Sequence, residues 1–430
     1  MDPQITPDTF CSYTPSPAEA DTTVFFISGN PGLISYYHPF LSLLGQYLAD
    51  DQDPLSKGAS VEKTPSHFQI YGCSLGGFEV PCDKTSPSGT NGGNGPPDAA
   101  QSGRSKLYSL EDQICFVHDK LNTLMTENAA SAKTPSASSR RQKVILMGHS
   151  VGAYIAMEVL RRHREASPSP EPHRQYTTDF DIIGGVMLFP TVKDIAHSPA
   201  GQKLTVRLIP PFYTANRPIL ILAISAMQTL LSFFPHFALV VGFLAHLLTT
   251  LLPSAALKWL IKLVMNDPPT HARDTTFSFL NSPGGVRQAL YVTPLPSAFL
   301  SLVICPRLMR KTRHMAADEM RTITSDKWTD DVWGVARARE PLTKLFFYFG
   351  RNDHWVAERT RDELIALRGG TDGESGPKMF VCEEGLPHAF CLSESENWES
   401  IWAIGADSHV GHNDVMARKV AGMIQDIGGN

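Results

Sequence analysis

Charged residues are scarce in this chain of 430 residues: they make up 19% of it, against about a quarter in an ordinary soluble domain. Hydrophobic residues make up 42%, which excludes a wholly disordered or acidic solvating protein. No basic excess is present, and the formal net charge of −5 argues against a general nucleic-acid binder. A mean hydropathy of −0.13 is too low for a polytopic membrane protein. These limits leave one large domain or two ordinary ones.

Several functional motifs are missing as well. The sequence holds no dinucleotide-binding fingerprint, no phosphate-binding loop and no HExxH zinc motif, so we expect neither a metal nor another cofactor. Residues 1–21 contain no basic residue and lack the apolar segment of a secretory signal. The seven cysteines form no CxxC pair, which favours reduced thiols in a protein facing the cytosol.

Short apolar runs alternate with segments of helical periodicity along most of the chain. Helices are predicted at 36–48, 107–124 and 153–160. Strands are predicted at 22–28, 68–75, 143–148, 182–189, 345–349 and 378–382. This alternation predicts an α/β fold with a mostly parallel sheet covered by helices on both faces. Polar stretches near 85–105, 128–142 and 166–176 are predicted to be disordered insertions.

The segment from Pro218 to Leu257 contains no charged residue. Pro235 divides it into halves of about 16 or 17 residues, slightly fewer than the roughly 20 that cross a bilayer. We therefore expect a helical hairpin that enters and leaves a lipid surface from one side; a buried cap over the active site is the alternative. The segment interrupts the alternation, which predicts an α/β core in two parts, at 1–203 and 331–430, with an apolar, basic helical cap inserted at 204–330.

Basic residues surround this uncharged segment. Between Arg207 and His314 there are ten basic and two acidic residues, a charge of +8, so the rest of the chain carries −13. The densest cluster is Arg307, Arg310, Lys311 and Arg313. Such residues attract an anionic, cytosol-facing lipid surface by about 1 kcal/mol each. The cluster predicts a membrane-facing surface, although a solvated basic face is the alternative.

The pentapeptide Gly148-His149-Ser150-Val151-Gly152 has the G-x-S-x-G pattern of a nucleophile elbow. An apolar strand precedes it and an amphipathic helix follows it. Glycines at 148 and 152 allow the neighbouring backbone to come close, and the helix N-terminus favours a developing oxyanion. We predict that Ser150 is a nucleophile; the alternative is a glycine-rich turn without one.

A serine nucleophile needs a base and an acid. In α/β folds with this elbow, the acid follows the serine along the chain and the histidine base follows the acid. Asp353 follows the strand at 345–349, and His388 follows the strand at 378–382. His354 competes as the base, and the weaker competitors as the acid are Asp372, Glu383 and Glu384. His149 is predicted to pack beneath the elbow.

Two backbone N–H groups are expected to bind the oxyanion. One belongs to Val151, the residue after the nucleophile. We expect the other from Asn30 in the turn after the first strand, where Pro31 has no N–H. The alternative is a turn that merely ends the strand. The predicted reaction is acyl transfer, in which Ser150 attacks an ester carbonyl and water deacylates the enzyme.

Four segments carry a resemblance to a known family: FISGNPGLISYYHPF (26–40), LMGHSVGAYI (146–155), FGRNDHWV (349–356) and GLPHAF (385–390). In these segments the chain resembles the lipid droplet-associated hydrolase family, and in particular a fungal member of it. The resemblance implies an α/β-hydrolase fold, a serine triad, and residence on lipid droplets and the cytosolic face of the endoplasmic reticulum. It also implies neutral lipid esters, such as triacylglycerol or sterol ester, as substrates. One departure is Ala357, where the family often has a proline.

The sequence thus predicts a carboxylic ester hydrolase of lipid storage and turnover, whose partners are its lipid ester and a droplet monolayer or reticulum membrane. We expect no nucleic acid and no specific protein partner. Two alternatives remain: a droplet-associated structural or tethering protein with little hydrolase activity, and a soluble hydrolase of small esters or thioesters.

Overall fold

The computed structural model describes most of the core of the chain. The described residues are 3–14, 21–30, 32–50, 67–79, 108–131, 141–166, 180–202, 255, 258–259, 306–335, 343–370, 376–392 and 411–429. Three predicted segments lie outside these residues: the uncharged segment at 218–257 apart from residue 255, the insertion at 85–105, and residues 167–176 of the insertion at 166–176. No described helix is both long and apolar enough to span a bilayer.

The centre of the fold is an eight-stranded sheet in the order β1-β2-β4-β3-β5-β6-β7-β8. The strands are β1 Gln4–Ile5, β2 Thr9–Thr14, β3 Thr22–Ile27, β4 Phe68–Cys73, β5 Gln142–His149, β6 Phe180–Leu188, β7 Lys344–Phe349 and β8 Lys378–Val381. The six neighbouring strands β4, β3, β5, β6, β7 and β8 pair in parallel. Strand β2 pairs antiparallel with both of its neighbours, β1 and β4. All six predicted strands are present, and the antiparallel pair of β1 and β2 is an addition to them.

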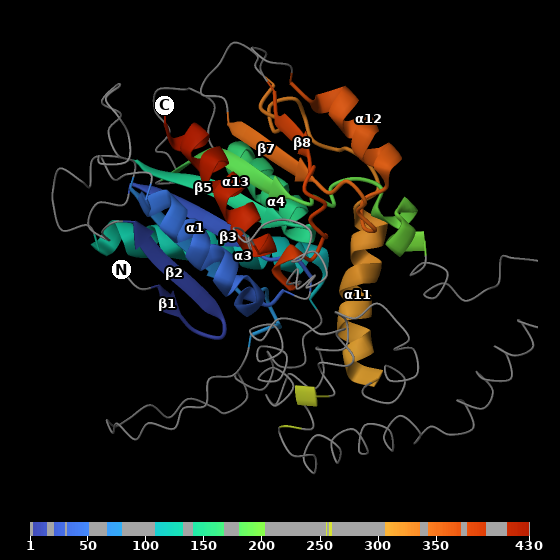
Figure 1. Ribbon diagram of the computed structural model, residues 1–430, viewed down its shortest axis with the longest axis horizontal. Helices are drawn as coiled ribbons and strands as arrows, with labels where there is room; N and C mark the ends of the chain where they lie inside the picture. The colour runs from blue at the N-terminus through green and yellow to red at the C-terminus, as the bar shows by residue number, and fades with distance from the viewer. Residues whose placement is uncertain are drawn as a thin grey trace, which may run out of the picture.

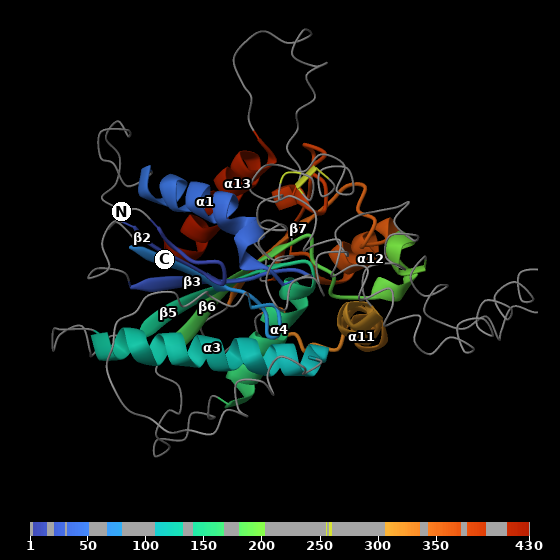
Figure 2. The ribbon, with the colours of Figure 1, turned by 90° about the horizontal axis from the view of Figure 1, so that it is seen from below.

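Helices cover both faces of the sheet, as the alternation predicted. The described helices are α1 His38–Asp50, α3 Leu110–Ser131, α4 Val151–Ala166, α11 Pro306–Thr322, α12 Glu358–Arg368 and α13 His412–Gly428, with short 3-10 helices η1 Ile34–Tyr37, η2 Ile195–His197 and η5 Phe390–Leu392. In Figure 1 the α1 and α13 ribbons lie side by side, and Figure 2 places them on the face opposite α3 and α4. This sheet order and layering is the α/β-hydrolase fold.

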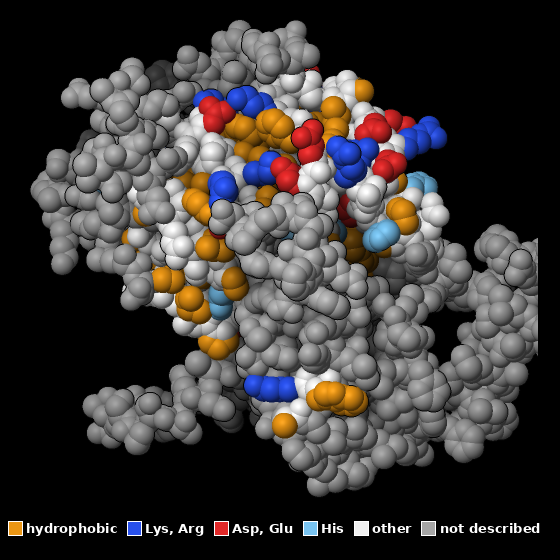
Figure 3. Space-filling model, in the orientation of Figure 1, with side chains coloured by type: hydrophobic (Ala, Val, Ile, Leu, Met, Phe, Trp, Pro, Cys, Tyr) orange, Lys and Arg blue, Asp and Glu red, His pale blue; other side chains and the backbone are white. Residues whose placement is uncertain are grey.

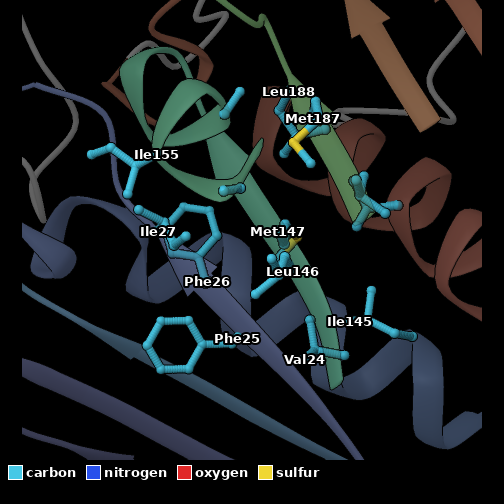
Figure 4. Packing of buried hydrophobic residues seen from close by; sticks show 14 of the residues in the cluster. Val24, Phe25, Phe26, Ile27, Ile145, Leu146, Met147, Ile155, Met187 and Leu188 are labelled. Atoms are coloured by element: carbon cyan, nitrogen blue, oxygen red, sulfur yellow. The ribbon is translucent and has the colours of Figure 1, made fainter. Parts of the chain in front are cut away.

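The core lies around the three central strands. The six residues of β3 are all buried, as expected for a parallel strand covered on both faces. Figure 4 shows their packing: Phe26 of β3, Met147 of β5 and Met187 of β6 are fully buried, and Ile155 joins them from α4. Burying each such side chain contributes roughly 1.5–3 kcal/mol to folding, so this cluster holds the strands firmly.

The strand register aligns the carboxyl ends of the strands. The paired residues at this edge are Ile27 with Gly148, His149 with Leu188, Leu188 with Tyr348, and Phe349 with Val381. The loops after β3, β5, β7 and β8 therefore open at one edge, and each of these loops carries a residue singled out from the sequence.

The bounds of one predicted insertion need correction. Residues 128–131 belong to α3, and β5 begins at Gln142, so the predicted insertion at 128–142 was too long at both ends. In the last turn of this helix, Asn128 Nδ2 donates to Gln69 Oε1 of β4 over 2.6 Å and contacts the sheet. The end of the predicted cap also packs on the core: Trp328 lies against Tyr154 of α4, with ring centroids 5.3 Å apart.

The described surface carries both signs of charge. In Figure 3 acidic and basic side chains are interspersed on the part of this face that is not grey. Two ion pairs connect α13 to the edge strand β8 and to the loop after it: Lys419 Nζ lies 2.6 Å from Glu384 Oε1, and Asp426 Oδ2 lies 2.7 Å from Lys378 Nζ. Such partly exposed pairs contribute about 0–1 kcal/mol each.

Candidate active site

Ser150 occupies a strained turn between β5 and α4. Its φ is 56°, a left-handed conformation that is rare for residues other than glycine. Neighbouring backbone holds it there: the Ser150 N–H donates to the Leu188 carbonyl over 2.9 Å, and the Ser150 carbonyl accepts the Ala153 N–H over 3.0 Å. The turn raises the side chain above the carboxyl edge of the sheet, as the pentapeptide predicted.

The two glycines of the elbow are required by close packing. A Cβ on Gly148 would lie 2.3 Å from the Gly152 carbonyl oxygen, and one on Gly152 would lie 2.3 Å from the Ile27 carbonyl oxygen. Both contacts are with backbone, which cannot move away cheaply. The glycine spacing thus allows α4 to begin directly against β3.

Ser150, His388 and Asp353 form one hydrogen-bonded chain. Asp353 Oδ2 lies 2.7 Å from His388 Nδ1, and His388 Nε2 lies 2.9 Å from Ser150 Oγ. A carboxylate only accepts, so Nδ1–H donates to Asp353, and Nε2 of the neutral ring accepts the Ser150 hydroxyl. The structure brings together the three residues that the sequence pattern selected, in an arrangement in which a histidine could take a proton from the serine hydroxyl.

The competing residues take other positions. The described residues among them, His354, Glu383 and Glu384, are all exposed. Glu384 is engaged by Lys419 and by the Tyr348 hydroxyl. Asp372 lies outside the described residues.

Asp353 is held in its charged form. Burial raises the pKa of this carboxyl, but the adjacent His388 and the Trp355 N–H, which donates to Oδ1 over 2.8 Å, outweigh burial and leave the pKa below its usual range. The Asp353 side chain is only 1% exposed. A buried carboxylate at this distance orients the His388 ring and favours an imidazolium when one forms.

His149 packs beneath the elbow, as predicted, and also makes hydrogen bonds that the sequence did not indicate. Burial, aided by the nearby His388, lowers the pKa of His149 to about 3, so the ring is neutral. Its Nε2 lies 2.8 Å from the His388 carbonyl oxygen, and its Nδ1 lies 2.8 Å from the Tyr37 hydroxyl. A carbonyl only accepts, so Nε2 carries the proton and Nδ1 accepts from Tyr37. His149 thereby connects the elbow to the loop of the base.

Tyr37 extends this connection to the loop after β3. Its hydroxyl accepts the Gly29 N–H over 3.2 Å while donating to His149. Burial raises the pKa of Tyr37 well above its usual value, so the hydroxyl keeps its proton. A continuous series of hydrogen bonds therefore runs from Gly29 through Tyr37 and His149 to His388.

Asn30 offers a backbone N–H in the loop after β3. The Gly29 N–H is taken by Tyr37, the Gly32 N–H donates to the Gly29 carbonyl over 2.6 Å, and Pro31 has no N–H. The Asn30 N–H has no acceptor among the described residues. A Cβ on Gly29 would lie 3.1 Å from the Ser150 Cβ, so this loop adjoins the serine.

Val151 is the second predicted donor and the first residue of α4. The first N–H groups of a helix have no intrahelical acceptor and carry the positive end of its dipole. The structure thus places one predicted donor, Val151, at the start of α4 directly after Ser150, and the other, Asn30, in the adjacent loop after β3.

Glu319 is a further contact of the site that the sequence did not reveal. Asn30 Nδ2 donates to Glu319 Oε1 over 3.3 Å, although the two residues are 289 positions apart. Glu319 lies in α11, within the segment predicted as a cap.

The basic cluster of Arg307, Arg310, Lys311 and Arg313 falls at the N-terminal end of α11. Their side chains lie outside the described part of the structure, so the membrane-facing surface stays a prediction. Among the described residues, no group of three His, Cys, Asp or Glu is arranged to hold a metal ion.

Comparison with known proteins gives consistent matches. A sequence profile of a family described as lipid-droplet associated hydrolase matches residues 20–294 and 296–391, which include all four segments quoted above. The lipid droplet-associated hydrolase of Mus musculus is 24% identical over 382 residues, 88% of this chain and 83% of that protein. The protein of that name from Dictyostelium discoideum is 22% identical over 386 residues, 89% and 87% of the two chains.

Among solved structures, a haloalkane dehalogenase from Bradyrhizobium elkani is similar with a TM-score of 0.43 and 11% identity, over 99% of this chain and 97% of that chain.

Proposed function

The chain belongs to the lipid-droplet associated hydrolase family, and from this membership we propose that it is a serine ester hydrolase with Ser150 as its nucleophile. His388 is the general base and Asp353 the residue that orients it. The observation that carries this proposal is the hydrogen-bonded chain from Ser150 Oγ through both nitrogens of His388 to Asp353, beneath a strained turn.

The first half of the reaction forms an acyl-enzyme. As Ser150 Oγ attacks the ester carbonyl, its proton passes to His388 Nε2, and the imidazolium is held by Asp353. The tetrahedral oxyanion accepts hydrogen bonds from the N–H groups of Asn30 and Val151. His388 then gives the proton to the leaving alkoxide, and the alcohol departs.

The second half repeats these steps with water. His388 Nε2 takes a proton from the water molecule, whose oxygen attacks the acyl carbonyl of Ser150. The same two donors bind the second oxyanion, and the proton returns to Ser150 Oγ as the fatty acid leaves. Each oxyanion donor supplies roughly 3–4 kcal/mol of transition-state stabilisation in hydrolases of this kind.

We infer that the substrates are neutral lipid esters, triacylglycerol or sterol ester, met at a lipid droplet monolayer or the cytosolic face of the endoplasmic reticulum. Relatives named for association with lipid droplets support this inference. The uncharged segment at 218–257 and the basic residues around it also support it. An apolar hairpin suits a phospholipid monolayer over oil, because it enters and leaves from one side.

A fluorophosphonate probe tests the nucleophile directly. We expect one label per chain, mapped by peptide mass spectrometry to Ser150 and absent from Ser150→Ala. His388→Ala should remove labelling, whereas the matched control His354→Ala should retain it, because His354 is exposed and outside the hydrogen-bonded chain. A folded wild-type protein that takes no label would exclude an activated Ser150 and favour the tethering alternative.

Binding to lipid is tested separately from chemistry. Replacing Arg307, Arg310, Lys311 and Arg313 by Gln should weaken binding to anionic vesicles about fivefold per charge, at about 1 kcal/mol each. The control replaces Arg359, an exposed arginine of α12, and should bind as wild type does. Deleting residues 218–257 should leave the protein in the cytosol; a deletion variant that still coats droplets would exclude the hairpin as the anchor.

A further inference from the structure

A buried carboxyl group contacts the loop that carries the proposed oxyanion donor. Glu319 of α11 is only 7% exposed, and its Oε1 accepts the Asn30 side-chain N–H over 3.3 Å. Neighbouring contacts fix the helix at this point. The Ile323 N–H donates to the Glu319 carbonyl over 2.8 Å, and Asp318 Oδ2 accepts the Leu110 N–H of α3 over 2.8 Å.

The Asn30 amide is only half satisfied by this contact. Its Oδ1 is buried and has no hydrogen-bond partner among the described residues. The missing partner must be a donor. An ionised carboxylate offers only acceptors, whereas a protonated carboxyl offers one donor and one acceptor. A neutral Glu319 therefore matches both ends of the Asn30 amide, in either orientation of that amide.

The surroundings of Glu319 also favour its neutral form. No Lys, Arg or His of the described chain pairs with it, and an unpaired buried charge is costly. Burial raises the pKa of Glu319 to about 8; the hydrogen bond from Asn30 opposes this and the neighbouring Asp318 adds to it.

Ionisable groups on the elements packed against α11 are engaged elsewhere. On α3, Glu111 pairs with Arg162 and Asp112 with Ser109; beside η2, Asp194 lies 3.7 Å from His197 and 3.9 Å from Lys193. The loop after β3 presents only the neutral Asn30 to the carboxyl group. The charge state of Glu319 is thus set by burial, which the hydrogen bond from Asn30 opposes and Asp318 reinforces.

We propose that Glu319 is a positioning residue that holds Asn30 as an uncharged acid, through a ring of two hydrogen bonds between its carboxyl group and the Asn30 amide. This inference rests on the proposed function, in which the Asn30 N–H binds the oxyanion. The ring fixes Asn30 from α11, while Tyr37 fixes the adjacent Gly29. Loss of the Glu319 proton breaks one of the two hydrogen bonds. It also places a negative charge beside Asn30, whose N–H must bind the negatively charged oxyanion.

The pH dependence of fluorophosphonate labelling tests the proposal. A group with a pKa of about 8 is about one-tenth protonated at pH 9, so the wild-type labelling rate should fall about tenfold from its plateau by that pH. Glu319→Gln keeps a donor and an acceptor without charge, and should hold the plateau through pH 9. The matched control Glu363→Gln, on the exposed face of α12, should follow wild type.

Two labelling results would overturn the proposal. One is an identical alkaline profile for wild type and Glu319→Gln. The other is a folded Glu319→Gln protein that labels slowly at every pH, since an uncharged isostere should replace a neutral acid. Glu319→Leu can form a hydrogen bond with neither end of the amide, and it should label about tenfold more slowly than wild type at pH 7. This loss is smaller than the roughly hundred- to thousandfold loss from deleting an oxyanion donor, because Asn30 is displaced and not removed.

Thermal unfolding gives a second readout that needs no catalysis. The folded chain binds the Glu319 proton more tightly than the unfolded chain, so wild-type stability should fall as pH rises from about 4.3 to 8. The Tm of Glu319→Gln relative to wild type should therefore increase between pH 5 and 8.5. If wild type took no label at any pH, the proposed function would fail and this measurement alone would decide on Glu319. A Tm difference that does not change with pH would contradict its role as a neutral acid.

Discussion

Replacing Tyr37 by Phe removes one hydroxyl group and changes little else. The Tyr37 side chain is 4% exposed, and its oxygen joins the Gly29 N–H to His149 Nδ1. The variant leaves both of these buried groups without a partner. Each unsatisfied group costs about 1–3 kcal/mol, so the free energy of unfolding should fall by roughly 2–6 kcal/mol.

The same change should slow the reaction of Ser150. Gly29 precedes Asn30, so loss of its anchor loosens the proposed oxyanion donor. We expect the fluorophosphonate labelling rate to fall at least about tenfold, part of the hundred- to thousandfold effect of removing an oxyanion donor. Urea unfolding measures the stability, and stopped labelling reactions measure the rate.

Tyr47→Phe is the matched control for this experiment. Its hydroxyl donates to Asp414 Oδ1 over 2.5 Å, which connects α1 to α13 away from the elbow. That variant should lose about 1 kcal/mol of stability and keep the wild-type labelling rate. Our reasoning about the loop is refuted if Tyr37→Phe loses less than about 0.5 kcal/mol and labels at the wild-type rate.

Three further changes have definite expected outcomes. Gly152→Ala places a Cβ 2.3 Å from the Ile27 carbonyl oxygen and should abolish labelling, whereas Gly422→Ala, with nothing within 4 Å in α13, should be neutral or stabilising in thermal unfolding. Asp353→Asn should lower kcat about 10⁴-fold in ester-hydrolysis kinetics, because His388 loses the carboxylate that orients it; a fall below tenfold contradicts that role. Burial lowers the pKa of His163 to about 4, so the unfolded chain takes up this proton first and stability falls as pH drops from about 6.5 to 4. His163→Phe should reduce the Tm difference between pH 7 and 5; an unchanged difference would show that His163 does not contribute.

The parallel strands from β3 to β7 in chain order could be predicted because they are largely buried on both faces, whereas the edge strand β8 is partly exposed. The residues TTVFFI of β3 and KLFFYF of β7 are continuous apolar or β-branched runs, which is what such strands require. The sequence TFCSYT of β2 mixes polar and apolar residues over only six positions and has neither a continuous apolar run nor a strict alternation. Its place in the sheet depends on antiparallel pairing with β4, a distant contact that no local pattern records.

The residues of the hydrogen-bonded chain could be predicted for a related reason. Ser150, Asp353 and His388 each follow a recognisable strand, and parallel strands bring their carboxyl ends to one edge. Tyr37 could not be identified, because a tyrosine on the apolar face of a predicted helix is indistinguishable from a core residue. Glu319 stands in a charged helix, and only the packing of α11 buries it beside Asn30.

The central claim is that Ser150 carries the acyl group between two half-reactions. Mixing the protein with a chromogenic ester, quenching in acid and measuring the intact mass tests this most directly. We predict an increase of one acyl group, located on the peptide that contains Ser150, lost in Ser150→Ala and retained in His354→Ala. Turnover of the ester by wild type with no acyl group on Ser150, or undiminished turnover by Ser150→Ala, would contradict the account.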